Sequence, residues 1–218
     1  MNNFLRLLVI NIIVIVVLIG GGATGYYFYD QATNYVKTSN ATVNGQAVSV
    51  VAPVSGKLMT WNATQGTRYE QNDTLGQIAG AGTDGKPSLT NVQIPQDATV
   101  AQNNGTANSF VAAGTQLAVA YNLDKLYVTA NIDETSIDKV KDGQKVDVWI
   151  DAFPGTLFSG KVSNIGSATS STFSLLSTTN TNGNYTKVTQ VIPVKIKLDD
   201  FKGDKLLPGM NVTVRIHI

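Results

Sequence analysis

Few residues in this sequence are of types that carry out covalent chemistry. The 218 residues include one histidine, His217, and no cysteine. One histidine cannot supply a multi-histidine metal site, and the lack of thiols excludes cysteine nucleophiles, thiolate metal sites and disulfides. Asp199 and Asp200 adjoin at a predicted strand end, where acidic residues commonly form turns. The sequence therefore predicts no enzyme, and no catalytic, cofactor-binding or metal-binding residues.

Two other residue types could bind ligands. Trp61 and Trp149 could stack on a flat ligand, but we interpret both as surface residues of a β-domain, because alternation places Trp149 opposite the buried set. Asn-x-Thr triplets resemble glycosylation acceptors, and we interpret them as a by-product of an Asn- and Thr-rich composition. These triplets begin at Asn40, Asn62, Asn72, Asn104, Asn184 and Asn211.

The overall charge restricts the class of partner. Only 14% of the residues are charged, and the formal net charge is +1. Proteins that bind a phosphate backbone usually carry a clustered excess of Lys and Arg. Nucleic acid is therefore not expected as a partner.

The N-terminal segment is strongly apolar. Residues 7–29 contain no charged side chain, with Arg6 before them and Asp30 after them. As a helix they extend roughly 34 Å, about the thickness of a bilayer's hydrocarbon core. We predict a transmembrane anchor over 7–29, with residues 1–6 in the cytoplasm and the bulk of the chain outside. A cleaved signal peptide is the alternative, although no clear small-x-small cleavage site follows.

A gapless repeat follows. Residues 52–78 align with residues 94–120 at an offset of 42, which pairs Pro53 with Pro95 and Leu75 with Leu117, among others. Each copy reads as a short strand, a turn rich in Gly and Asn, and a second strand. Two such units are expected to form a small β-sandwich.

The remaining sequence alternates apolar and polar residues, as strands with one buried face do. Such segments lie at 126–132, 146–150, 192–198 and 212–218, and the last places His217 on the polar face. Asp133 can cap a short helix through Lys141, with Gly143 as its stop. We predict a small β-barrel with one short helix.

The predicted fold is mainly β. Its expected parts are a cytoplasmic N-terminus (1–6), the anchor (7–29), a polar connector (30–46), the sandwich (47–118, as halves 47–79 and 90–118 joined by the linker 80–89) and the barrel (119–218). The segment 166–186, rich in Ser, Thr and Asn, is expected to leave the barrel as a long excursion. A loop of that length is usually functional or disordered.

The sandwich sequence resembles a lipoyl/biotinyl-type domain. The pattern is Ala52, Pro53, Gly56, Leu58, Gly66, Asp73, Leu75 and Ile78. In lipoyl and biotin carriers, a modified lysine lies in the turn between the halves. Lys86 is the candidate here, but its neighbours Gly85 and Pro87 do not match the attachment contexts, so we interpret it as an ordinary loop lysine.

The order of anchor, split lipoyl-like unit and barrel resembles the HlyD/EmrA-like membrane fusion protein, or periplasmic adaptor, family. The most specific stretch is FSLLSTTNTNGNYTKVTQVIPVKIKL at 173–198, with further similarity in LYVTANIDET at 126–135 and LLPGMNVTV at 206–214. The resemblance implies a homo-oligomeric, non-catalytic adaptor that assists multidrug efflux. Its implied partner is an inner-membrane transporter of the major facilitator type or, second, the ABC type.

The linker 80–89 is too short for the coiled-coil hairpin with which relatives reach an outer-membrane channel, since it spans at most about 15 Å as a helix. We therefore expect no such channel, and a single-pass protein in the plasma membrane of a bacterium with a Gram-positive-type envelope. Two alternative functions remain: a surface-exposed structural or ligand-binding protein, or a lipoyl/biotinyl carrier domain.

Overall fold

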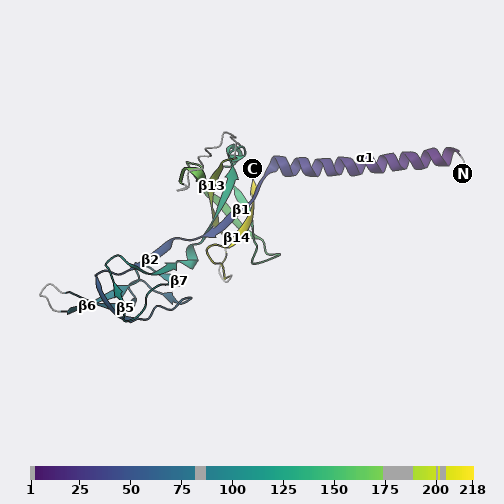
Figure 1. The fold of residues 1–218 in the computed structure, drawn as a ribbon. Coiled ribbons are helices and arrows are strands. Elements are labelled where there is room, and N and C mark those ends of the chain that lie inside the picture. Colours follow the sequence, from purple (N-terminus) through teal and green to yellow (C-terminus); the bar gives the residue numbers. More distant parts are fainter. Residues whose placement is uncertain (1–2, 82–86, 174–188, 200, 202–204) are drawn as a thin grey trace, which may run out of the picture. The chain divides into compact units, whose positions relative to one another are not determined.

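The computed structural model describes residues 3–81, 87–173, 189–199, 201 and 205–218 (Figure 1). The chain divides into two compact units. One comprises residues 1–41, 130–199 and 212–218, and contains the helix and most of the barrel. The other comprises residues 42–129 and 200–211, and contains the sandwich; we call it the sandwich unit.

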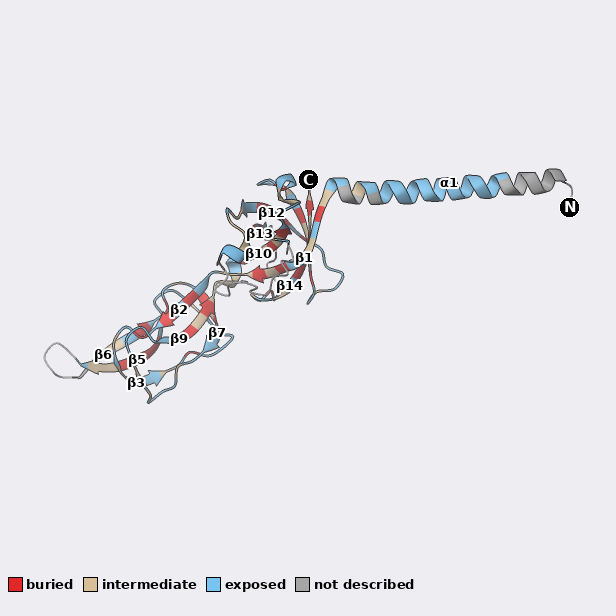
Figure 2. Ribbon diagram, turned by 45° about the horizontal axis from the view of Figure 1, so that its top comes forward, coloured by how far each residue is buried: buried red, intermediate tan, exposed pale blue. Residues whose placement is uncertain are grey.

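An α-helix, α1, runs from Asn3 to Asn34 and covers the residues expected to form the anchor. Its side chains from Ile12 to Ile19 are exposed in this single chain, as the pale-blue ribbon in Figure 2 shows. Within the described residues, no helix satisfies the combined requirement of length and apolarity for crossing a membrane.

Six strands close a barrel in the order β1-β10-β13-β12-β11-β14. Their bounds are β1 Tyr35–Asn44, β10 Tyr127–Asp133, β11 Lys145–Ile150, β12 Phe158–Ile165, β13 Val191–Leu198 and β14 Asn211–His217. The four alternating segments of the sequence all lie in or beside these strands. Their apolar members face the interior, as successive strand side chains point to opposite faces. Val128, Val148, Ile196 and Val214 are fully buried.

The sandwich consists of two four-stranded sheets, β2-β9-β7-β4 and β6-β5-β3-β8. The strands are β2 Ala47–Val51, β3 Gly56–Trp61, β4 Arg68–Tyr69, β5 Thr74–Ala81, β6 Pro87–Gln93, β7 Ala98–Asn103, β8 Phe110–Val111 and β9 Gln116–Tyr121. Buried Leu58, Leu75, Ile78 and Leu117 belong to one apolar core between them. The sandwich expected from the repeat is therefore present.

The repeat governs the pairing of these strands. Val48 lies opposite Ala120 in one sheet. Their equivalents in the other copy, Thr90 and Ile78, lie opposite each other in the other sheet. The pairs of β3 with β8 and of β7 with β4 obey the same rule, as do the bulges. Each sheet takes strands from both copies, so neither copy can complete a sheet alone.

The turns repeat as well. Gly66 has a φ of +82°, and its equivalent Asn108 has a φ of +69°. Asn72, at +70°, is matched by Gly114, at +84°. Glycine and asparagine are the residues that adopt this left-handed conformation most readily. The two residue types have thus exchanged places between the copies, while the backbone has kept its shape.

The prediction of an irregular connector over 30–46 is wrong. Helix α1 continues to Asn34, and β1 follows at once as a barrel strand. The hydropathy pattern did not predict this strand because its middle is polar. Thr38 Oγ1 donates to the carbonyl of Asn131 at 3.0 Å, and Asn131 Nδ2 donates to Asn40 Oδ1 at 3.0 Å. These cross-strand hydrogen bonds replace apolar contacts.

Three other boundaries differ from expectation. The short helix predicted over 133–141 is only a 3₁₀ turn, Ile137–Lys139, since so few residues cannot offset the cost of starting an α-helix. Part of the linker 80–89 is strand, because β5 and β6 stay paired as far as Ala81 and Pro87. The barrel was expected over 119–218, yet β9 extends into this range as a sandwich strand. Of the excursion 166–186, residues 174–186 lie outside the described residues, and a 3₁₀ turn occupies Ser170–Phe173.

Candidate functional site

Most of the residues that the sequence singled out do not come together. Lys86 and Asp200 lie outside the described residues. Asp199 is exposed, and its backbone N–H donates to Ser159. Trp61 packs against the sandwich core and donates from Nε1 to Asn103 Oδ1 at 2.7 Å, so it is an anchored structural side chain. Trp149 and His217 both belong to a cluster on the barrel.

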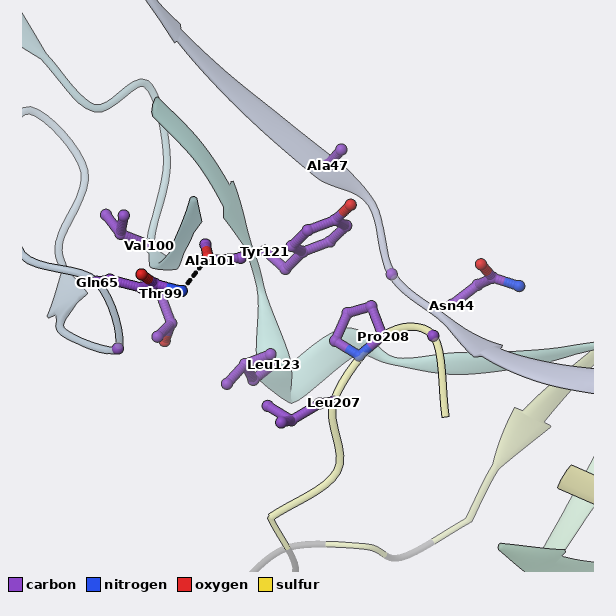
Figure 3. A pocket seen from close by; sticks show the side chains of 13 residues that line it. Asn44, Ala47, Gln65, Thr99, Val100, Ala101, Tyr121, Leu123, Leu207 and Pro208 are labelled. Atoms are coloured by element: carbon purple, nitrogen blue, oxygen red, sulfur yellow. Dashed lines mark hydrogen bonds between the residues drawn. The ribbon is translucent and has the colours of Figure 1, made fainter. Parts of the chain in front are cut away.

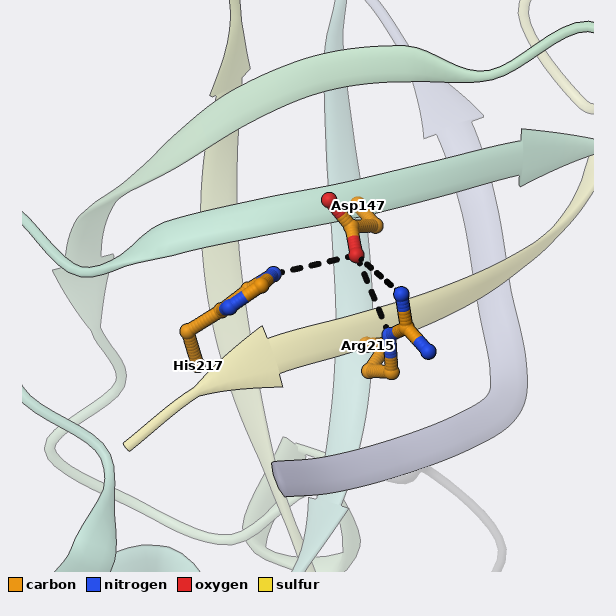
Figure 4. Close-up of polar contacts among 3 residues, drawn as sticks. All are labelled: Asp147, Arg215 and His217. Atoms are coloured by element: carbon orange, nitrogen blue, oxygen red, sulfur yellow. Dashed lines mark hydrogen bonds and ion pairs between the residues drawn. The ribbon is translucent and has the colours of Figure 1, made fainter. Parts of the chain in front are cut away.

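We call this group the Asp147 cluster: Asp147, Arg215, His217, Tyr35 and Trp149. It forms because β11 and β14 pair with Asp147 directly opposite Arg215. Arg215 donates to Asp147 Oδ2 from Nε at 3.0 Å and from Nη2 at 2.6 Å. His217 Nε2 lies 3.0 Å from the same oxygen, as Figure 4 shows. Both partners thus converge on one carboxylate oxygen.

The aromatic members of the cluster hold the cation. The Arg215 guanidinium lies 4.8 Å from the ring centre of Tyr35 and 5.1 Å from that of Trp149. The Tyr35 and His217 rings meet edge to face at 5.0 Å. Cations over aromatic faces gain about 0.5–1 kcal/mol at exposed sites. The cluster therefore ties β1, β11 and β14 together on the outer face of the barrel.

The electrostatics keep Asp147 charged. Partial burial raises the pKa of Asp147, but hydrogen bonds from Arg215 and His217, together with the charges of those side chains, lower it more. The pKa of this carboxyl therefore lies below its ordinary value. A carboxylate that stays ionised and accepts three hydrogen bonds is a poor general acid or base near neutral pH. The geometry suits a structural tie.

The sequence placed these side chains on polar strand faces but did not pair them. Alternation put His217 opposite the buried set, and the structure confirms this. Asp147 and Arg215 obey the same alternation. Which of them face each other depends on the strand register, which alternation does not specify.

A second feature lies in the sandwich unit, a groove of about 570 Å³ (Figure 3). We call it the Tyr121 groove. Its walls include Ala47, Thr99, Ala101, Tyr121, Leu207 and Pro208. The last two come from the segment that precedes β14, and each lies at least 86 residues after the others in the sequence. No sequence pattern predicts the groove, because its walls meet only in the folded chain.

Comparison with known proteins gives this architecture a family. The YknX-like beta-barrel domain family matches residues 126–216. A Bacillus subtilis (strain 168) protein named as an efflux system component, YhbJ, is 43% identical over 211 residues, which are 97% of this chain and 92% of that protein. The chain belongs to the HlyD/EmrA-like membrane fusion protein family. The resemblance found in the sequence is thereby confirmed.

EmrA-type proteins resemble this membrane fusion protein in sequence over half of its length and in fold over most of it. The colistin resistance protein EmrA of Acinetobacter baumannii is 40% identical over 111 residues, covering 50% of this chain but only 31% of that relative. The solved structure of the periplasmic adaptor protein EmrA has a TM-score of 0.55 at 14% identity, covering 84% of this chain and 98% of that one. At this identity the likeness concerns the fold.

Within the described residues, no group of three or more carboxylate or imidazole side chains gathers as metal ligands do. Among the described residues, the Asp147 cluster and the Tyr121 groove are two candidate features for function. Neither presents a nucleophile beside a base.

Proposed function

We propose that this chain is a membrane-anchored, extracytoplasmic adaptor of a bacterial multidrug-type efflux system. It assists export by an inner-membrane transporter and performs no catalysis of its own. The observation that carries this proposal is the 43% identity to an efflux system component across 97% of the chain. A likeness of that extent includes the helix, the sandwich and the barrel together.

The anchor is supported by the surface of α1. Ile12, Val17 and Leu18 are 51%, 65% and 68% exposed in the single chain. Apolar side chains all around a helix are typical of burial in lipid or in protein, because water contact costs about 25 cal/mol per Å² of apolar surface. Arg6 before the apolar run and Asp30 after it favour an N-terminus in the cytoplasm.

The partners follow from the length between the sandwich halves. Five residues separate Ala81 at the end of β5 from Pro87 at the start of β6. A helical hairpin that reaches an outer membrane needs tens of residues at 1.5 Å each. We therefore propose no outer-membrane channel and a plasma membrane of the Gram-positive type. The resemblance to EmrA-type adaptors, rather than this length, implies a transporter of the major facilitator class, with the ABC class second.

A homo-oligomer is part of the same proposal. Membrane fusion proteins act as assemblies, and each β-unit here is rigidly tied within itself, by the Asp147 cluster in the barrel and by exchanged strands in the sandwich. Rigid modules of one kind can pack side by side with closed symmetry.

The test is purification of the tagged full chain from native membranes in a mild detergent. The tag follows Ile218 through a flexible linker, because the Ile218 N–H donates to the carbonyl of Asn34 and must stay in place. Mass spectrometry then identifies the partners and measures the intact chain. We expect a multispanning transporter in near-stoichiometric yield, with residues 1–29 retained.

Other results would contradict parts of the proposal. A co-purifying outer-membrane channel would refute the short-adaptor assignment. A chain that is recovered alone and lacks its first 25 or so residues would refute the anchor and favour a released surface protein. An added lipoyl or biotinyl mass on Lys86 would favour a carrier domain. The matched control is the same preparation from cells that express the untagged chain.

A further inference from the structure

One wall of the Tyr121 groove is a preformed turn. Met210 N–H donates to the carbonyl of Leu207, with Pro208 and Gly209 between them. Gly209 has a φ of +92°. Proline at the second position and a positive-φ glycine at the third are the signature of a type II turn. The turn is therefore rigid before any ligand arrives.

Two hydrogen bonds fix this turn to β1. Gly209 N–H donates to the carbonyl of Val43 at 2.8 Å, and Val43 N–H donates to the carbonyl of Met210 at 2.9 Å. Pro208 and Leu207 are thereby held at the groove, where Leu207 remains 50% exposed. An exposed leucine on a fixed turn keeps its apolar surface available for a ligand.

A glycine of the lining, Gly45, lies beside Tyr121. A Cβ at Gly45 would meet Leu126 Cδ2 at 2.8 Å and Tyr121 Cδ1 at 3.3 Å. A side chain at position 45 would require small shifts of Leu126 and of the Tyr121 ring, which lies at the groove in Figure 3. The ring is half-buried, so one part of its surface is fixed by packing and another part is open.

The lining carries no ionisable carboxylate, lysine or arginine. Its polar groups are amides and hydroxyls, including Gln65, Thr99 and the Tyr121 hydroxyl. Gln65 is oriented, because its Nε2 donates to the carbonyl of Ala101 at 2.9 Å. Nearby, Arg68 and Asp124 neutralise each other at 2.8 Å. A pocket of this size, mainly apolar with a few placed polar groups, is typical of small-molecule sites.

The internal repeat shows that the groove is not a general property of the sandwich. Subtracting 42 converts Ala101 into Met59, Thr99 into Lys57 and Tyr121 into Ala79. The equivalent surface thus has a lysine and lacks the ring. Met59 there is 43% exposed. The second copy of the repeat therefore carries groove residues that the first copy lacks.

We propose that the Tyr121 groove binds a small neutral molecule that has a flat apolar ring system and one or two hydrogen-bonding groups. The ring lies against Tyr121, Pro208 and Leu207, and the polar groups meet Gln65 and Thr99. This site goes beyond the adaptor role, because binding here requires no transporter. Its failure would leave the proposed function intact, and the reverse also holds.

The absence of cysteine from the chain permits a direct test. Ala101→Cys places a thiol in the groove, and Met59→Cys places one at the equivalent site of the other copy; both parent residues are exposed. The full chain in lipid nanodiscs is labelled with a sulfonated maleimide, with and without the neutral probe N-phenyl-1-naphthylamine. At about four times Kd, one fifth of the sites stays free, so we expect labelling at 101 to slow about fivefold.

The control variant separates groove binding from solution effects. Labelling at 59 should keep its rate, because this position lies outside the groove. Probe dissolved in the nanodisc lipid would instead slow labelling in both variants alike. Adding Tyr121→Ala to Ala101→Cys, which installs the residue of the other copy, should remove the protection. The proposal is overturned by equal protection at both positions, by none up to the solubility limit of the probe, or by protection that survives Tyr121→Ala.

Discussion

The two copies of the sandwich repeat fold the same backbone with different surfaces. Their strand pairs and bulges correspond at an offset of 42, and the positive-φ sites fall at equivalent turns. Outside the core the side chains diverge, as Tyr121 against Ala79 and Arg68 against Phe110 show. Core and turn positions therefore specify the sandwich, while surface positions are free to acquire a groove at one end only.

The largest effect should come from the core positions that the copies share. Leu75 is 0% and Leu117 is 1% exposed, and each lies one residue inside the start of its strand. Leu75→Ala and Leu117→Ala should each lower the free energy of unfolding by about 2–5 kcal/mol, because each leaves a cavity. Urea unfolding followed by Trp61 fluorescence in a Trp149→Phe background measures both losses.

The stricter prediction is that the two variants, Leu75→Ala and Leu117→Ala, lose similar amounts of stability. Since both sheets contain strands of both copies and the two leucines occupy equivalent places in one core, the two losses should agree within about 1 kcal/mol, because the cost depends on how far the surroundings can relax. A leucine whose truncation is harmless, while the other unfolds the sandwich, would show that the copies do not share one core.

The next effect separates the copies at a position where they differ. Gly56 corresponds to Ala98, yet a Cβ at Gly56 would lie 2.2 Å from the carbonyl oxygen of Ala79. Gly56→Ala should therefore cost about 1–3 kcal/mol, because backbone must shift. Ala98→Gly removes one methyl group and adds chain entropy, and should cost about 0.5–1 kcal/mol. Thermal unfolding of the two single variants compares the costs, and a harmless Gly56→Ala would contradict the close approach.

Much of this fold could be predicted from the sequence. The repeat predicted the sandwich, and alternation at 126–132 and 212–218 predicted which side chains the barrel buries. Strand β1 was missed because Thr38 and Asn40 form hydrogen bonds with Asn131 on the neighbouring strand β10, so no apolar period marks them. The Asp147 cluster and the Tyr121 groove were missed because strand register and a turn at 207–210 create them. Sequence periodicity encodes neither.

The sandwich repeat does not extend into the barrel, so a barrel variant serves as a comparison for the sandwich variants. Asp147→Asn should lower stability at pH 7 by about 1–2 kcal/mol, since it weakens charge-assisted hydrogen bonds from Arg215 and His217. The pKa of Asp147 is depressed in the folded chain. Its stabilising effect is thus complete above the unfolded pKa of about 3.9 and is lost as pH falls through the folded pKa.

The stability difference between Asp147→Asn and the parent chain should consequently shrink below about pH 4. Urea midpoints at several pH values, read from Trp149 fluorescence in a Trp61→Phe background, measure this difference. The matched control is Asp138→Asn, an exposed carboxyl of the same unit that takes part in no ion pair among the described residues. A difference that persists unchanged at pH 3 would contradict the assignment of the tie to the Asp147 charge.

The smallest effect is expected where the copies have exchanged residues. Gly66→Asn and Asn108→Gly each install what the other copy uses at a φ near +70° to +80°. Asparagine tolerates this region, so the double exchange should change the free energy of unfolding, measured by urea unfolding, by no more than a few tenths of a kcal/mol. Gly66→Val is the contrasting variant, because a β-branched residue there is strained and should cost about 1–2 kcal/mol. If the exchange cost as much as the valine, the turns would differ in their demands, and the equivalence of the copies would end at their strands.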